Sequence, residues 1–164
     1  MKDHFVASFQ KVGAFRIVNG QKQGGNVASY FTTPDGAVLH VVAGPVDAKV
    51  LLREARWAVE THKLALTESG GDLMRQRLTF RRAHFDRLQR EHGGEWRMPR
   101  ATPNVAVEVF AMHELRKYKI DQQGQIHLLL TAYPLAKTEL IYRTVFETIL
   151  RERVSTNPVD GRDS

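Results

Sequence analysis

The sequence contains no cysteine among its 164 residues. The absence of cysteine excludes disulfides, thiolate metal sites and cysteine nucleophiles within this chain. Thiol–disulfide exchange within this chain is therefore chemically impossible. Any activity must depend on other side chains.

The sequence also lacks a long apolar run: nowhere do about 18 apolar residues follow one another, which is the length that a membrane-spanning helix needs. Its first four residues do not lead into the apolar core of a secretory signal. Hydrophobic residues nevertheless make up 42% of the chain, enough to supply a core. We therefore expect a soluble, cytoplasmic protein with no membrane partner.

Positive charge is abundant and unevenly distributed. The net charge is +6 and the sequence pI is about 9.8. Residues 72–100 carry eight Lys or Arg against four Asp or Glu, whereas residues 101–164 carry eight of each. A basic middle segment is compatible with nucleic acid or another anionic partner, and it also serves ordinary solubility.

Residues 26–65 give the clearest structural signals. Two runs rich in β-branched and aromatic residues, Val27 to Thr32 and Val38 to Val42, flank a Pro-Asp-Gly turn at residues 34–36, which predicts a β-hairpin. Asp47 then stands where it can cap a helix, and apolar residues recur at helical spacing from Ala48 to about Leu66. The pattern predicts a helix lying on one face of a small sheet.

The remaining segments complete an α+β pattern. We expect a strand within residues 4–12 that continues into 14–18, and a polar glycine-rich turn or loop at 19–25, so that three strands precede the first helix. Glycines at 70 and 71 mark a boundary, after which residues 73–91 read as a second helix. Further along, we expect a linker at 95–103, an ambiguous segment at 104–133 for which we prefer helix to strand, and a helix over 137–153.

This pattern predicts a small antiparallel or mixed sheet with one packed helix, followed by a helical extension. The predicted units are residues 1–68, residues 72–154 and a flexible tail at 155–164. Trp57 lies off the centre of the first helix's apolar stripe, where packing at an edge is favoured over a role as a ligand platform.

The central stretch resembles the second half of a thioredoxin-like domain. The resemblance lies in a strand at residues 27–31, the Thr-Pro-Asp-Gly turn at 33–36, an edge strand at 38–44 and a closing helix at 46–61. Residues 5–11 would correspond to the preceding strand of that fold.

The departures from the family concern its chemistry. Thioredoxin-like enzymes carry Cys-x-x-Cys at the start of a helix, and we expect that half of the fold to be missing from this chain. Asn26 stands where the family has its cis-proline. The resemblance therefore implies a non-catalytic relative that acts in protein interaction or scaffolding, with another protein or a second copy as its partner.

The alternative function is nucleic-acid binding through the arginine-rich helix at 73–91. Arginine side chains bind phosphates through paired N–H groups. A solvated helix face with intrahelical ion pairs is the competing interpretation. The candidate residues are Arg75, Arg77, Arg81, Arg82, Arg87 and Arg90.

Seven histidines raise the question of a metal, but their spacing does not indicate one. No pair stands at i and i+4 with a carboxylate partner, and no His-Glu-x-x-His motif is present. His40 lies in a predicted strand and His127 in an apolar run, so we expect a packed or capping residue at each position. We expect no metal site, no cofactor and no catalytic group, while enzyme activity of another kind is left open.

Overall fold

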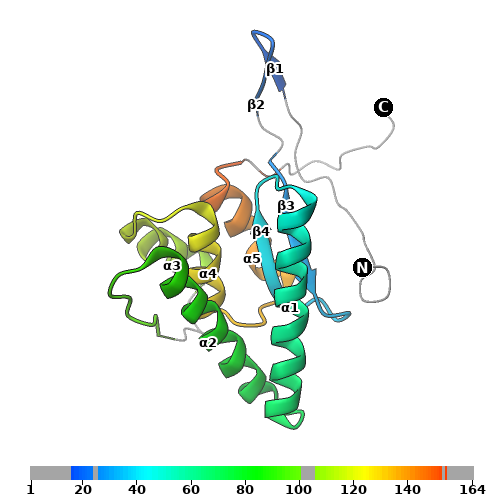
Figure 1. Ribbon diagram of the computed structural model, residues 1–164. Helices are drawn as coiled ribbons and strands as arrows, with labels where there is room; N and C mark the ends of the chain where they lie inside the picture. Colours follow the sequence, from blue (N-terminus) through cyan, green and yellow to red (C-terminus); the bar gives the residue numbers. More distant parts are fainter. Residues whose placement is uncertain (1–15, 24–25, 101–105, 153, 155–164) are drawn as a thin grey trace.

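The computed structural model describes residues 16–23, 26–100, 106–152 and 154. Within these residues the protein is α+β: two antiparallel hairpins come first, and five α-helices follow (Figure 1). The strand expected within residues 4–12 and the tail expected at 155–164 lie outside the described residues. No helix in the described part of the chain has the length and apolar character needed to cross a membrane.

The first hairpin corrects one expectation. Strand β1 (Arg16–Val18) pairs with β2 (Gln21–Gln23) around Asn19 and Gly20, whose φ angles are 51° and 75°. Two central residues with positive φ match the twist of a tight hairpin. Residues 19–23 of the predicted turn or loop at 19–25 are therefore a turn followed by a strand, and the described residues contain four strands before the first helix. The polar strand was missed because backbone pairing and the turn define it, without apolar alternation.

The second hairpin is confirmed. Strand β3 (Ala28–Thr32) pairs antiparallel with β4 (Val38–Ala43), and Gly36 adopts a φ of 83° in the turn between them. The amide of Gln123 covers part of the other edge of β4, because it accepts a hydrogen bond from the N–H of Ala43 (3.1 Å) and donates one to the carbonyl of Val41 (2.9 Å). This side-chain amide takes the place of a neighbouring strand.

Two long helices follow, as expected. Helix α1 (Ala48–Ser69) begins at Asp47, whose carboxylate accepts a hydrogen bond from the N–H of Val50 (2.8 Å). It ends at Gly70 in the left-handed conformation, with φ 58°. Helix α2 (Leu73–His92) begins at Asp72, which accepts from the N–H of Arg75 (2.9 Å).

The C-terminal segment is helical throughout most of its described length. The preference for helix over strand at 104–133 is confirmed by α3 (Val107–His113), the short 3₁₀ turn η1 (Leu115–Lys117) and α4 (Gln122–Ala132). The helix expected over 137–153 is shorter: α5 (Thr138–Thr144) continues as a π-helical turn, η2 (Val145–Ile149), and ends there. Apolar spacing alone does not distinguish these two windings.

The hairpin of β3 and β4 lies between α1 and the C-terminal helices (Figure 1). Leu39 and Val42 of β4 pack in one cluster with alanines of α1 and with Phe80 of α2. Val38 and Val41 belong to a second cluster that the C-terminal helices dominate. The predicted units 1–68 and 72–154 thus share a core, and β4, α2 and α4 meet around one point.

Candidate metal centre

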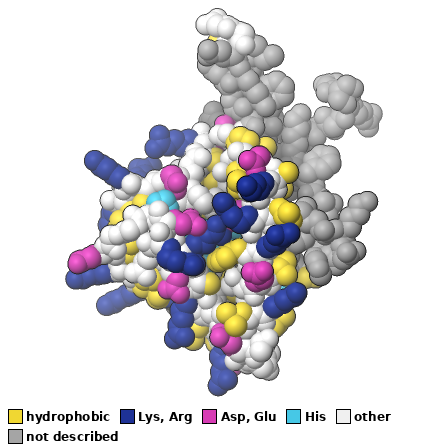
Figure 2. Space-filling view, in the orientation of Figure 1, with side chains coloured by type: hydrophobic (Ala, Val, Ile, Leu, Met, Phe, Trp, Pro, Cys, Tyr) yellow, Lys and Arg dark blue, Asp and Glu magenta, His cyan; other side chains and the backbone are white. Residues whose placement is uncertain are grey.

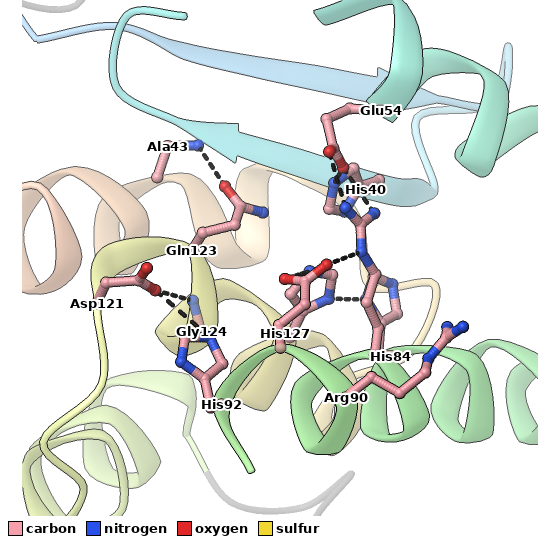
Figure 3. A network of polar contacts seen from close by, with 12 residues as sticks. His40, Ala43, Glu54, His84, Arg90, His92, Asp121, Gln123, Gly124 and His127 are labelled. Atoms are coloured by element: carbon pink, nitrogen blue, oxygen red, sulfur yellow. Dashed lines mark hydrogen bonds and ion pairs between the residues drawn. The ribbon is translucent and has the colours of Figure 1, made fainter. Parts of the chain in front are cut away.

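Three histidines meet where β4, α2 and α4 converge (Figure 3). His40 comes from β4, His84 from α2 and His127 from α4, and all three are at most 1% exposed. Their ring centroids are 5.7 Å apart for His40 and His84, and 5.2 Å apart for each pair that includes His127. One ring nitrogen from each residue lies within 4.8 Å of those of the other two.

The Nε2 atoms of His40 and His84 each lie within hydrogen-bond distance of an oxygen acceptor. His40 Nε2 lies 3.0 Å from Glu54 Oε2, and His84 Nε2 lies 3.0 Å from the carbonyl oxygen of Leu39. His127 Nε2 lies 4.0 Å from Glu91 Oε2. The Nδ1 atoms of His84 and His127 are 3.0 Å apart.

All three imidazoles are neutral near pH 7. Burial lowers the pKa of His40 despite its hydrogen bond to Glu54. Burial, reinforced by the neighbouring histidines, holds the pKa values of His84 and His127 well below the ordinary value. Neutral imidazole has one N–H and one free lone pair, and it is the form that binds metal ions.

The hydrogen-bond partners of the rings indicate which nitrogen of each histidine carries the proton. A carbonyl only accepts hydrogen bonds, so His84 donates from Nε2 to Leu39 and keeps a lone pair on Nδ1. His40 likewise donates from Nε2 to Glu54, which leaves a lone pair on its buried Nδ1. His127 then donates from Nδ1 to the Nδ1 lone pair of His84.

Two nitrogens of the cluster are left without a hydrogen bond. Among the described residues, the buried His40 Nδ1 and His127 Nε2 have no hydrogen-bond partner. Leaving a buried polar atom unpaired costs about 1–3 kcal/mol. Without a metal, this cluster is incompletely satisfied.

A buried ionic network surrounds the histidines. Arg87 Nη2 donates to Glu54 Oε1 (2.7 Å) and Arg87 Nε donates to Glu91 Oε1 (2.6 Å), while exposed Arg53 also donates to Glu54 (2.9 Å). Burial opposes the ionised form of Glu54, but hydrogen bonds from His40 and Arg87 outweigh it and lower the pKa of this carboxyl group. Glu54 is therefore ionised. Buried Arg87 balances its charge, while Glu91 and Arg53 are exposed partners of these two side chains.

Trp57 closes one side of the cluster. Its ring centroid lies 4.9 Å from that of His40 and 4.9 Å from that of His84, with both contacts edge-on. The Arg87 guanidinium carbon lies 5.0 Å from the indole centroid. The indole thus packs between the histidines and the charged network.

The six arginines of the predicted anion site differ in exposure and in their partners. Arg75, Arg77, Arg82 and Arg90 are exposed on α2. Arg81 is half-buried and donates to the Met98 sulfur and to the carbonyl of Pro99. Arg87 is buried and paired with two carboxylates, so it belongs to the histidine site. Anion binding by the other five arginines remains a prediction.

Asn26, expected at the position of the family's cis-proline, precedes β3. Its side-chain amide donates to the carbonyl of Leu150 in a long contact of 3.4 Å. It therefore links the start of the second hairpin to the end of η2, and the structure does not bring it to the histidine cluster.

Sequence reasoning did not find the histidine cluster because its members are 44 and 43 positions apart. His40 and His127 did carry a weak signal, since each interrupts a run of apolar residues. His84 had no such signal among its arginine neighbours. The packed positions expected for His40 and His127 are confirmed, but their packing partners include one another.

The fold and the site define an α+β protein with a buried cluster of three histidines. Comparisons extend this description no further: no family model, no curated protein and no solved structure matches the chain.

Proposed function

We propose that this chain is a metal-binding protein in which His40, His84 and His127 hold a divalent transition-metal ion through their Nδ1 atoms. The main observation behind the proposal is where the nitrogens of the three rings lie. The Nε2 atoms of His40 and His84 each donate to an oxygen acceptor, and His127 Nε2 lies 4.0 Å from Glu91 Oε2. One ring nitrogen from each of the three buried residues lies within 4.8 Å of the other two. Metal-binding histidines characteristically donate their other N–H to a carboxylate or carbonyl in this way.

The dimensions of the cluster suit a small ion. Nitrogens around a tetrahedral Zn²⁺ lie about 3.3 Å apart, since each Zn–N bond is about 2.0–2.1 Å long. The Nδ1 atoms of His84 and His127 are 3.0 Å apart, and the cluster as a whole spans no more than 4.8 Å. Small adjustments of the rings would therefore complete a three-histidine site. Imidazole ligands suit Zn²⁺, Cu²⁺, Ni²⁺ and Fe²⁺, and Zn²⁺ is our first candidate.

Metal binding also resolves the unpaired nitrogens. A metal would take the free lone pair of His40 Nδ1. It would also require His127 to carry its proton on Nε2, which lies 4.0 Å from Glu91 Oε2. A cluster that served packing alone would gain none of these contacts.

The test is a binding titration of the full chain, freed of any affinity tag and dialysed against a chelator. We expect one Zn²⁺ or Co²⁺ to bind per chain, with a Co²⁺ absorption spectrum typical of histidine coordination. His84→Ala should abolish this binding, whereas His113→Ala, which removes an exposed histidine of α3, should not. His127→Phe supplies a second loss variant with an apolar ring. Absence of stoichiometric binding by the unsubstituted chain would overturn the proposal.

The thioredoxin-like relationship remains a proposal of its own. It is supported by the hairpin of β3 and β4 followed directly by α1, which is the order of the second half of that fold. A relative of this kind would have a histidine metal site and no cysteine for thiol chemistry. Protein interaction or scaffolding is compatible with a metal site of structural type.

A further inference from the structure

A surface hollow of about 560 Å³ lies directly outside the histidine cluster. It is open to solvent and is lined by residues of α1 and α2. On the face that carries these helices, Lys or Arg side chains and Asp or Glu side chains alternate (Figure 2). The lining residues are Arg53, Trp57, Arg87, Arg90 and Glu91.

The floor of this hollow is also the outer wall of the cluster. Trp57 contacts the rings of His40 and His84, and Glu91 Oε2 lies 4.0 Å from His127 Nε2. A single layer of side chains therefore separates a molecule in the hollow from the three histidines. A metal ion there would add two positive charges immediately behind this layer.

The lining carries three guanidinium groups and one carboxylate. Arg53 is exposed, with 68% of its side chain accessible, and Arg90 is exposed on the next helix. Arg87 contacts the indole ring and is paired with Glu54 and Glu91, and Arg53 also donates to Glu54. Guanidinium groups bind phosphate and carboxylate oxygens through paired N–H donors, so the exposed side chains of Arg53 and Arg90 suit an oxyanion.

Glu91 connects the two sites. It now accepts from Arg87 through Oε1 at 2.6 Å, while its Oε2 lies 4.0 Å from His127 Nε2. If His127 bound a metal through Nδ1, its proton would be on Nε2 and would attract Glu91 toward the cluster. Glu91, the carboxylate of the lining, would then compete less for the arginines.

We propose that the hollow bounded by Arg53, Arg87 and Arg90 is an oxyanion site whose affinity rises when the histidine cluster holds a metal. The ligand is a small phosphate-type anion or the phosphate group of a larger molecule. This inference rests on the proposed metal site. The inference adds an oxyanion as a second ligand, and it identifies Glu91 as the residue that couples the metal site to the oxyanion site.

The probe is inorganic phosphate, titrated calorimetrically into the Co²⁺-loaded chain after desalting and into the metal-free chain. We expect phosphate to bind the loaded chain about tenfold more tightly or better, because the ion's charge lies close to the hollow. Arg90→Ala should weaken phosphate binding and leave Co²⁺ binding unchanged. Its matched control is Arg82→Ala, an exposed arginine of the same helix that does not line the hollow.

The outcomes separate the two proposals. If the chain binds no metal, both are wrong. If Co²⁺ binds but phosphate does not, or binds equally to both forms, the oxyanion inference alone is wrong. It is also wrong if Arg82→Ala weakens phosphate binding as much as Arg90→Ala does.

Discussion

Glu54 joins the histidine cluster to the charged side chains around it. It is a buried carboxylate of α1 that accepts from His40, Arg53 and Arg87. A buried charge is tolerated when oppositely charged partners are next to it. If one partner is removed, the remaining charge is buried without compensation, which destabilises the fold. Glu54 therefore supports the fold and also orients a proposed metal ligand.

Glu54→Ala should lower the free energy of unfolding by about 3 kcal/mol. The reason is that Arg87 would remain buried with Glu91 as its only carboxylate partner among those that the structure shows. The measurement is urea unfolding of the metal-free chain, with Glu60→Ala as the control at an exposed position of α1. Surface substitutions of that kind change stability by about 0.5 kcal/mol or less. Equal losses for the two variants would show that the network contributes nothing special.

For single residues, helix-capping roles could be predicted from the sequence, whereas the proposed metal ligands could not. Asp47 was identified as a helix cap because capping depends on a backbone N–H three positions away. The positions of His40, His84 and His127 depend on how three elements pack together. Sequence spacing carries no information about that distance, and a single histidine in an apolar run is compatible with many environments.

Among the elements, α2 and α4 make an unusually close approach. The ring of His92 at the end of α2 lies against Gly124 in the first turn of α4 (Figure 3). A Cβ atom added at Gly124 would stand 2.6 Å from His92 Nε2 and 3.0 Å from its Cε1. The His92 ring therefore occupies the space that a side chain at position 124 would need.

Gly124→Ala should therefore destabilise the protein by about 1–3 kcal/mol, as overpacking does, although alanine is the better helix former. The measurement is thermal or urea unfolding. The matched control is the double variant His92→Ala with Gly124→Ala, in which the clash is absent and the second substitution should no longer cost stability. If Gly124→Ala is stabilising in the unsubstituted background, the ring of His92 moves aside freely and the close approach is not a constraint.

The element boundaries show where sequence patterns were sufficient. The hairpin of β3 and β4 and the helices α1 and α2 were predicted well because turn, cap and periodic signals coincide. The last helix was predicted too long. Ile141, Val145 and Ile149 are buried as its apolar stripe requires, but the winding changes to a π-turn after Thr144, and Arg151 has a positive φ of 57°. Burial of the same residues is compatible with either winding.

At the scale of the whole molecule, the α+β class and the order of most elements could be predicted, but the shared core could not. Sequence reasoning separated residues 1–68 from 72–154 at the glycines of the α1–α2 turn. In the structure α2 packs against both α1 and α4, and the cluster lies between the two predicted units. A glycine turn marks a reversal of the chain, and it does not say whether the flanking helices belong to one core.

The same three-element junction makes the stability of the metal-free protein dependent on pH. His40, His84 and His127 have folded-state pKa values below the ordinary value of about 6.5. Above pH 6.5 these residues are neutral in both states and contribute no pH dependence. Below pH 6.5 these histidines become protonated in the unfolded chain but stay neutral in the folded cluster. The free energy of unfolding therefore falls as the pH falls.

We expect unfolding of the metal-free chain to become easier between pH 6.5 and 5, by about 1.4 kcal/mol per pH unit for each proton involved. His127→Phe should reduce this slope by about one proton, because a neutral apolar ring replaces a buried imidazole. His113→Ala should leave the slope nearly unchanged, since this histidine is exposed. The measurement is urea unfolding at a series of pH values. A flat profile between pH 7 and 5, or an equal change of slope in both variants, would mean that the buried histidines do not control it.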